Sequence, residues 1–387
     1  MIFILLISGL CACSDRTKID AAVNSEGEMK HEEKKEIENL DLKDEDECID
    51  VLELHLLDVD QGTSVLIKDG NHWMLYDGGD SGTSSYVVAY LKKQGIEKLD
   101  YIIASHYDAD HISGLIGALN VFECEKVICP DYETDTDIFY SFESMLTKNG
   151  AKIVFPKCGD TYVLGAGTFT IVGPRSYEYA QENDRSICVR LEYGSTHFLM
   201  CGDAEYPAET DMINSSEELQ SELLVVSHHG SGNASSKDFL EKVQPQYALV
   251  SCMLGNQYGH PAEETLGRLK ENGCKLYRSD LQDEIIAYSN GSEIWMNQDP
   301  SFDWSSGAEL LNQMENQNSN DRNNQGEGTA ATNNESVQYV CNTNTMRFHY
   351  EYCSSVHQMS EKNKKYVTAT RDELIAQGYK SCGNCNP

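Results

Sequence analysis

The chain has 387 residues, and its 63 acidic against 30 basic side chains give a formal net charge of −33 at pH 7. Such an acidic protein repels polyanions, which argues against non-specific nucleic-acid binding through a basic face. The length allows two or three domains, and a hydrophobic fraction of 40% is enough for a sizeable core.

The chain begins with a short apolar segment, residues 1–13, which is too short to span a membrane as a mature helix. The segment has the character of the apolar region of an export signal. Its end resembles a bacterial lipoprotein signal in which Cys13 is lipidated, although Cys11 stands where a small residue is usual. We therefore expect an extracytoplasmic protein, either a cell-surface lipoprotein anchored to the membrane or a secreted protein. The charged segment 14–50, which has no aromatic residue, predicts an acidic, disordered tether.

Residues 51–297 have the pattern of a folded domain in which strands and helices alternate. Apolar and alternating runs predict the first strands, at 51–57, 63–67 and 73–76. Beyond them we expect helices at 86–94 and 139–148 and strands at 101–104, 126–129 and 152–155. A β-rich stretch follows, with strands at 168–172, 186–192, 197–200 and 223–226. Two halves of sheet, each covered by helices, indicate an α/β fold arranged as an αββα sandwich.

The most informative stretch joins the strand at 101–104 to an amphipathic helix that we expect to begin at Gly114. Two histidines and two aspartates stand within six positions of this connection: His106, Asp108, Asp110 and His111. Imidazole nitrogen and carboxylate oxygen are both zinc ligands, and a tight loop can point alternate side chains at two ions. Capping of the helix by Asp110 is the alternative, but capping does not explain four such residues together. We therefore predict a divalent-metal site here.

The pattern His-x-Asp-x-Asp-His at 106–111 resembles the signature of the metallo-β-lactamase superfamily. Asp108 stands where a second histidine is usual, and this variant resembles the hydrolase domain of ComEC-type DNA-uptake proteins. The turn 58–62, Asp-Val-Asp-Gln-Gly, resembles the Asp-Val-Gly-Gln-Gly turn of the same group. The resemblance implies that Asp77, in an Asp-Gly-Gly turn, supports the metal loop without binding metal, as a carboxylate that fixes a ligand imidazole.

Three further motifs resemble elements of this group and imply more site residues. Asp203, in a Gly-Asp at a strand end, matches the aspartate that bridges two ions, with an ordinary turn residue as the alternative. One of His228 and His229 is implied to bind metal, and the other to face the substrate or complete the second ion's shell. Ser231 would donate a hydrogen bond to a phosphate. His260, in Gly-His-Pro, would orient substrate, protonate a leaving alkoxide or complete a metal shell, unless it only flanks the next helix.

One motif of many binuclear members is missing. Where they carry an additional histidine ligand, this chain has Asn-Asp-Arg-Ser at 183–186. ComEC-type domains also have Asn-x-x-Ser there, so the difference does not imply an inactive protein, but it leaves the coordination of one ion open. His197 comes later, in an expected hairpin strand, and we assign it a structural role.

The composition changes at the end of the expected domain. Residues 298–336 are rich in Asn, Gln, Ser, Gly and Glu, which predicts a flexible linker. A compact unit follows at 337–387, with four residues at the spacing of metal ligands: His349, Cys353, Cys382 and Cys385. Such a closed set is typical of a structural zinc site. The unit resembles the small metal-binding domain of the Ada DNA-repair protein, with His349 in place of a cysteine. The alternative in an oxidising compartment is a disulfide, Cys382–Cys385 or Cys353–Cys382.

The residues and the resemblance together imply an exported metallo-hydrolase with two divalent ions, zinc or manganese, in its site. The implied ligands are His106, Asp108, Asp110, His111, Asp203, His228 and His229. Such ions lower the pKa of a bound water and supply hydroxide for attack on phosphorus. Asp110 would orient that hydroxide, and His260 would act on the substrate. The ComEC-type motifs indicate a phosphodiesterase or nuclease that cleaves DNA or another phosphodiester, and we expect it to be monomeric.

Two other functions remain open at this stage. An esterase acting on cell-wall phosphorylcholine or teichoic acid would share the scaffold, and an acidic body suits a zwitterionic ligand better than a polyanion. A non-catalytic metal-binding or adhesion module would have lost ligands, and the sequence shows no loss beyond the missing histidine near 183–186.

Overall fold

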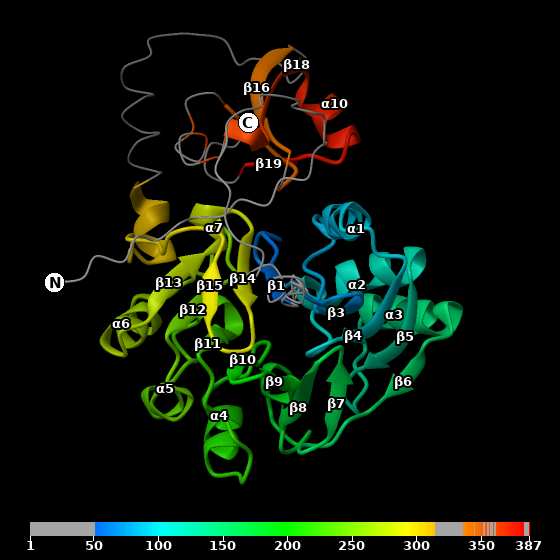
Figure 1. The fold of residues 1–387 in the computed structure, drawn as a ribbon, viewed down its shortest axis with the longest axis vertical. Helices are drawn as coiled ribbons and strands as arrows, with labels where there is room; N and C mark the ends of the chain where they lie inside the picture. Colours follow the sequence, from blue (N-terminus) through cyan, green and yellow to red (C-terminus); the bar gives the residue numbers. More distant parts are fainter. Residues whose placement is uncertain are drawn as a thin grey trace, which may run out of the picture. The chain divides into compact units, whose positions relative to one another are not determined.

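The computed structural model of the chain describes residues 51–313, 336–343, 345–350, 353, 356, 359, 361–382 and 387. The predicted signal segment, the acidic tether and Cys385 lie outside these residues. Residues 51–313 form two large β-sheets packed face to face, with helices on their outer faces (Figure 1). This is the αββα sandwich that the sequence predicts. Among the residues described, no helix combines the length and the apolar character that crossing a membrane requires.

The first sheet has eight strands in the order β15-β14-β1-β2-β3-β4-β5-β6. They are β1 (Leu52–Leu56), β2 (Val65–Asp69), β3 (His72–Tyr76), β4 (Lys98–Ile103), β5 (Glu123–Ile128), β6 (Lys152–Val154), β14 (Ile285–Ser289) and β15 (Ile294–Met296). Strands β3 to β6 run parallel, and helical crossovers join them, as parallel pairs require. The helices are α1 (Ser84–Lys93), α2 (Ala109–Val121) and α3 (Asp137–Asn149), which cover the outer face of this sheet.

The second sheet has seven strands in the order β13-β12-β11-β10-β9-β8-β7. They are β7 (Thr161–Leu164), β8 (Gly167–Gly173), β9 (Cys188–Tyr193), β10 (Thr196–Met200), β11 (Leu223–Val225), β12 (Tyr247–Val250) and β13 (Lys275–Arg278). Strands β10 to β13 are parallel. The helices that connect them are α4 (Tyr206–Ile213), α5 (Lys237–Val243) and α6 (Glu263–Glu271), and the short helix α7 (Ser279–Gln282) follows β13.

The main core lies between the two sheets, where every second side chain of a strand points inward. In β1, Leu54 faces this core, whereas His55 contacts Tyr90 of α1 on the outer face. The hydroxyl of Tyr76 donates a hydrogen bond of 2.8 Å to the carbonyl oxygen of Ile187, which links β3 to the segment just before β9. The two sheets are therefore fixed against each other beside the strand that leads into the predicted metal loop.

Helix α2 begins earlier than predicted. Its N-cap residue is Asp108, whose side chain makes no capping hydrogen bond, so Asp110 and His111 lie in the first helical turn rather than in a loop. Gly114 is inside the helix for a packing reason, because a Cβ atom there would lie 1.8 Å from the carbonyl oxygen of Gly78. The glycine marks a close approach of two backbones and not the start of the helix.

The sandwich also includes residues 298–313, so the prediction of a flexible linker is wrong for this segment. The amide of Ser301 donates a hydrogen bond of 2.7 Å to the carbonyl oxygen of Leu276. Residues 307–313 are helical, and Leu310 is only 8% exposed. A composition averaged over the whole predicted linker hides these few anchoring residues. Nearly all of the remaining predicted linker lies outside the described residues.

His55 is buried between two glutamates, which makes the stability of this region depend on pH. Its Nε2 lies 3.1 Å from Glu53 Oε2, and its Nδ1 lies 3.4 Å from Glu284 Oε1. Burial lowers the pKa of His55, but the two glutamates outweigh burial and raise the pKa above its usual 6.5. Because the pKa of His55 is higher in the folded than in the unfolded protein, protonation of His55 stabilises the fold. This contribution is complete at pH values below the pKa of the unfolded state. That stabilisation is lost as the pH rises through the folded-state pKa.

We expect the His55→Gln variant to be less stable than the parent protein at about pH 6, and the difference to shrink towards about pH 9. Thermal unfolding of both proteins, recorded at pH values from about 6 to about 9, measures this difference in stability. The other titrating groups are the same in both proteins, so the difference between the two curves isolates His55. A difference that stays constant over the range would contradict the prediction.

The C-terminal unit has its own four-stranded sheet, in the order β18-β16-β17-β19. Its elements are β16 (Val337–Asn342), β17 (Arg347–Tyr350), the 3₁₀ turn η3 (Glu361–Asn363), β18 (Lys364–Ala369), α10 (Arg371–Ala376) and β19 (Lys380–Ser381). Helix α10 begins with a capping box between Thr370 and Glu373. Tyr339, Phe348 and Leu374 belong to the small core of the unit.

Two cations of the C-terminal unit contact residues 58–62 of the sandwich, which we call the acidic turn. Arg347 Nη2 pairs with the carboxylate of Asp58 and lies 3.7 Å from Asp60 Oδ1. Lys380 Nζ lies 3.0 Å from Asp60 Oδ2. Burial raises the pKa of Asp58 to about 7, against the opposing attraction of Arg347 and Lys380. Ion pairs that are largely shielded from solvent therefore tie the unit to the acidic turn.

Candidate metal centre

The candidate metal site is assembled where three parallel strands end. His106 follows β4, and the first turn of α2 carries Asp110 and His111. The remaining candidates follow β10 (Asp203) and β11 (His228 and His229, within the 3₁₀ turn η2, Ser227–Gly230). The carboxyl ends of strands in open α/β sheets are the usual place for binding sites. The topology thus gathers residues that are more than a hundred positions apart in the chain.

The side chains of these residues converge on Asp203. His111 Nε2 lies 3.2 Å from Asp203 Oδ1, and His229 Nε2 lies 3.5 Å from Asp203 Oδ2. His229 Nε2 is also 3.4 Å from Asp110 Oδ2. Two overlapping groups have all their ligand atoms within 4.8 Å of one another: His106, His111 and Asp203, and Asp110, His111 and His229.

The Nδ1 atom of each buried histidine has a partner on the side away from the cluster. His111 Nδ1 lies 2.8 Å from Asp77 Oδ2, and His229 Nδ1 donates a 3.0 Å hydrogen bond to the Ser251 carbonyl oxygen. Asp77 is fully buried and also accepts a hydrogen bond from the Ser105 amide at 2.8 Å. Such partners fix the ring orientation and leave Nε2 facing the cluster. Asp77 therefore lies where a supporting carboxylate is expected.

The donor atoms that face the cluster fit a bound cation. Within the described part of the chain, Nε2 of His106, His111 and His229 and Oδ1 of Asp203 are buried and make no hydrogen bond. Buried polar atoms in folded proteins nearly always have a partner. Imidazole nitrogens and carboxylate oxygens in this arrangement are the ligands that zinc and similar divalent ions take. The residues present could therefore hold a divalent metal.

The charges of the cluster also fit a bound divalent metal. Burial disfavours the charged form of His229, but Asp203 and Asp110 raise its pKa to about 9. The same carboxylates raise the pKa of His111 well above its usual value. In return the imidazoles lower the pKa of Asp110 to about 2 and that of Asp203 well below its usual value, although burial opposes both shifts. The ionised carboxylates require positive charge beside them, which a divalent cation or protonated imidazoles supply.

The same segment of the chain matches a protein family. The model of the metallo-beta-lactamase superfamily covers residues 57–253, about half of the chain and every predicted metal ligand of the sandwich. The chain belongs to the metallo-β-lactamase superfamily.

Curated relatives of this metallo-β-lactamase domain include bacterial competence proteins. "Competence protein ComA" of Neisseria gonorrhoeae is 30% identical over 227 residues, which are 58% of this chain and 30% of that protein. "ComE operon protein 3" of Bacillus subtilis (strain 168) is 25% identical over 256 residues, 61% of this chain and 33% of that protein. The match thus spans about a third of the length of each relative. Among solved structures, the metallo-β-lactamase fold protein YhfI from Bacillus subtilis is 15% identical, covers 57% of this chain and 92% of its own, and gives a TM-score of 0.39.

Three other predicted residues border the metallo-β-lactamase cluster. Asp108 Oδ2 lies 3.5 Å from His106 Nε2, with half of the Asp108 side chain exposed. His228 Nε2 lies 3.6 Å from Asp203 Oδ2. The ring of His260 is 5.4 Å from that of His228 between centroids, and burial together with His228 and His229 lowers the pKa of His260 to about 4.

The backbone at His228 and His229 explains how neighbouring residues both reach this site. Both have positive φ, 51° and 54°, a conformation that residues other than glycine rarely adopt. Strain of this kind is typical of functional sites. Ser231 is less directly placed: its amide donates to the His228 carbonyl oxygen at 2.8 Å, while its hydroxyl accepts a long hydrogen bond of 3.4 Å from the Asn233 amide.

The sequence motifs did not predict the partners of His228. Its Nδ1 lies 2.9 Å from Glu205 Oε1 and 3.5 Å from Asn183 Nδ2. Glu205 follows the candidate bridging aspartate by two positions, a spacing that could have drawn attention to it. Asn183 belongs to the 3₁₀ turn η1 (Asn183–Arg185), the place where the family resemblance implies an additional histidine ligand. An amide that contacts a candidate ligand thus stands where that ligand is missing.

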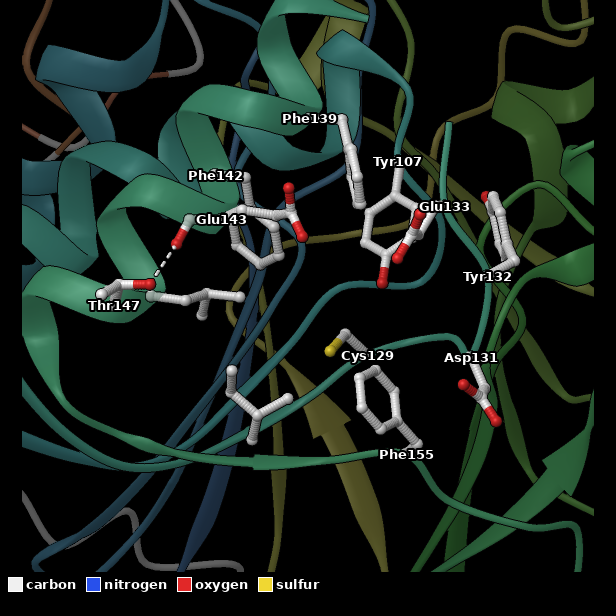
Figure 2. A pocket seen from close by; sticks show the side chains of 12 residues that line it. Tyr107, Cys129, Asp131, Tyr132, Glu133, Phe139, Phe142, Glu143, Thr147 and Phe155 are labelled. Atoms are coloured by element: carbon white, nitrogen blue, oxygen red, sulfur yellow. Dashed lines mark hydrogen bonds between the residues drawn. The ribbon is translucent and has the colours of Figure 1, made fainter. Parts of the chain in front are cut away.

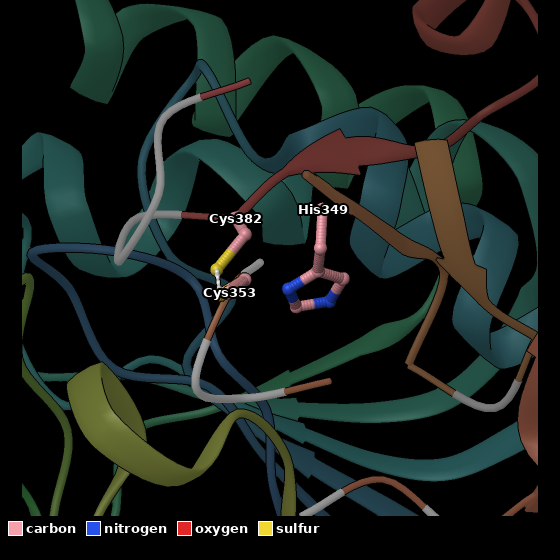
Figure 3. Close-up of side chains that lie close together, drawn as sticks. All are labelled: His349, Cys353 and Cys382. Carbon is pink, nitrogen blue, oxygen red and sulfur yellow. Dashed lines mark hydrogen bonds between the residues drawn. The ribbon is translucent and has the colours of Figure 1, made fainter. Parts of the chain in front are cut away.

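A second cluster of metal-binding character lies in the C-terminal unit. His349, Cys353 and Cys382 are buried and point towards one another (Figure 3), with their ligand atoms within 4.8 Å. Among the described residues, neither ring nitrogen of His349 has a hydrogen-bond partner. The two sulfurs are 3.9 Å apart, well beyond the ~2.05 Å of a disulfide. The structure therefore does not contain the alternative Cys353–Cys382 bond.

Proposed function

We propose that this protein is a metal-dependent phosphodiesterase with DNA or another phosphodiester as its substrate. The observation that supports this most directly is the convergence of three imidazole nitrogens, each without a hydrogen bond in the described chain, on the Asp203 carboxylate. The ComEC-type motifs and the likeness to proteins named for competence favour a nucleic acid. Metal ions would also offset locally the net charge of −33 that otherwise repels a polyanion.

Two overlapping groups of residues would hold the ions. One group is Asp110, His111 and His229, and the other is His106, His111 and Asp203, with Asp108 beside His106. Asp203 would also serve the first group, because its Oδ1 lies 3.2 Å from the shared His111 and its Oδ2 lies 3.5 Å from His229. His228 lies between Asp203 and Glu205 and would complete the second group. Divalent ions bound there supply Lewis acidity, which activates water and offsets the charge that develops on phosphate oxygens.

The side chains of the protein supply orientation and proton handling. Asp110 is ionised because its pKa is about 2, so its carboxylate accepts a hydrogen bond from the attacking water and fixes its direction. His260 is neutral near pH 7, since its pKa is lowered to about 4. A neutral imidazole donates an N–H hydrogen bond but has no proton to give to a leaving alkoxide. The ring of His260 lies 5.4 Å from that of His228 between centroids, at the border of the cluster, and we propose that it orients the substrate.

Hydrolysis by the metal-loaded full chain tests the proposal. Single-stranded DNA, double-stranded DNA and a phosphorylcholine ester are offered separately, with Zn²⁺ or Mn²⁺. Cleavage of DNA that stops when a chelator removes the metal is the expected result. Cleavage of the phosphorylcholine ester alone would reject the nuclease and favour a cell-wall esterase as the function of this protein. Absence of turnover with every substrate by protein that has bound its metal would overturn the phosphodiesterase.

We further propose a structural zinc ion in the C-terminal unit, held by His349, Cys353 and Cys382, with Cys385 as the expected fourth ligand. Replacing Cys382 by serine removes a soft thiolate ligand from a closed site. We expect the Cys382→Ser protein to bind one zinc ion fewer per chain than the parent, as measured by elemental analysis after dialysis. A Cys158→Ser protein is the control, because that cysteine lies outside both clusters. Equal zinc content in parent and Cys382→Ser protein would refute the site.

A further inference from the structure

A pocket beside the metal loop has no role in the proposed function. It is a pocket of about 200 Å³ between α3 and the segments that follow β5 and β6 (Figure 2). These segments leave the carboxyl edge of the same sheet that carries the metal loop after β4. Tyr107, which lines the pocket, stands in the chain between His106 and Asp108. A molecule in the pocket would therefore be next to the metal loop.

Five aromatic side chains are among the residues that line the pocket: Tyr107, Tyr132, Phe139, Phe142 and Phe155. Tyr107, Phe139 and Phe142 are buried, and the Tyr107 ring centroid lies 4.7 Å from that of Phe139 and 6.1 Å from that of Phe142. The Tyr107 hydroxyl donates to the Pro130 carbonyl oxygen at 2.7 Å, so this ring offers the pocket its apolar surface. Phe155 also lines the pocket and is 53% exposed, so its ring is the most accessible of the five.

Three carboxylates surround this aromatic surface. Asp131, Glu133 and Glu143 line the pocket (Figure 2), and all three are exposed. Within the described chain none of them forms an ion pair, and no lysine or arginine lines the pocket. Tyr132, which also lines the pocket, already carries a cation on one side of its ring, the guanidinium of Arg185 at 5.0 Å from the centroid. The pocket thus combines aromatic rings with three carboxylates, and its described lining contains no lysine or arginine.

We propose that this pocket binds a small organic cation of the alkylated ammonium class. The negative faces of the rings attract such a cation, and its methyl groups fill an apolar pocket that a hydrated metal ion would not. A phosphate or a carboxylate would be repelled by the three acids. A neutral apolar group would fit against the rings, but the three carboxylates would add nothing to its affinity. The proposal concerns binding only, so it holds whether or not the protein hydrolyses phosphodiesters.

Calorimetric titration of the full chain with choline tests the proposal. The matched probe is 3,3-dimethylbutan-1-ol, which has the same shape and no charge. We expect saturable binding of choline and binding of the neutral isostere that is about ten times weaker or less. Equal affinities for the two probes would show that the pocket binds by its apolar surface alone, which would overturn the proposal. Absence of saturable choline binding would also overturn it.

Two variants connect the binding to the pocket. Phe155→Leu keeps an apolar side chain but removes a ring face, and a cation–π contact of usual strength makes choline binding about three- to thirtyfold weaker on its loss. Glu133→Gln removes one charge at constant shape and weakens choline but not the neutral probe. Tyr140→Ala is the control, because Tyr140 is 52% exposed on α3 and does not line the pocket. Choline affinity unchanged in both pocket variants would refute this location.

Discussion

Replacement of Asp203 by asparagine will lower kcat/KM for metal-dependent hydrolysis by at least about a hundredfold, since even residues that only support metal ligands cost ten- to a hundredfold when changed. Asp203 is the centre of the cluster: its Oδ1 lies 3.2 Å from His111 Nε2, and its Oδ2 lies 3.5 Å from His229 Nε2 and 3.6 Å from His228 Nε2. Asparagine keeps the shape but loses the charge and one acceptor oxygen. Initial rates together with bound metal per chain measure the effect.

The matched control is Asp238→Asn, an exposed aspartate in the first turn of α5. It makes the same chemical change at a distance from the cluster, so rates and metal content are expected to match those of the parent. Full activity and full metal content in the Asp203→Asn protein would show that the cluster is not the hydrolytic site. Loss of metal without loss of activity would point to the same conclusion.

Replacement of Arg347 by methionine will destabilise the protein by about 3–5 kcal/mol, the usual cost of removing one partner from a buried ion pair. The Arg347 side chain is 2% exposed and faces Asp58, Asp60 and Asp283. Methionine fills much of the space but leaves these carboxylates without their main cation. Burial already raises the pKa of Asp58 to about 7. Chemical denaturation of the full chain measures the loss, and proteolysis of the C-terminal unit is expected to become faster.

A second substitution distinguishes lost charge from lost packing. In the Arg347→Met, Asp58→Asn double variant one of the unpaired charges is removed, so part of the lost stability is expected to return. Lys362→Met, a change at an exposed lysine of the same unit, is expected to be neutral. If Arg347→Met unfolds at the same denaturant concentration as the parent protein, the ion pairs with the acidic turn do not hold the unit in place.

The sequence predicts the αββα fold well because the strand and helix patterns of the first half are strong and the metal loop stands at a strand end. The glycines of the motifs say less about element boundaries. Gly114 resembles the start of a helix in the sequence, but a glycine is needed there because the backbone of Gly78 lies too close for a side chain. A boundary set by a tertiary contact has no local signal. The same applies to residues 298–313, where a few anchoring side chains such as Leu310 outweigh a linker-like composition.

The candidate site is predicted in part for a similar reason. The histidines and aspartates at strand ends are conspicuous as residue types, so the sequence identifies them and the topology brings them together. Glu205 and Asn183 are common surface residues, and only the fold shows that both contact His228. The pairing of Arg347 with Asp58 joins residues at opposite ends of the described chain. Residue spacing carries no information about such a contact.

The position of β14 has a consequence for how the chain folds during synthesis. Strand β1 is translated long before β14, but it lies in the sheet between β2 and β14, and Leu52 pairs with Ser289. Its second edge therefore stays open until nearly the whole sandwich has been translated, and pairings of such long separation form slowly. An exposed strand edge is a site for aggregation in the meantime. Nascent chains that stall before β14 is translated therefore keep this edge of β1 exposed.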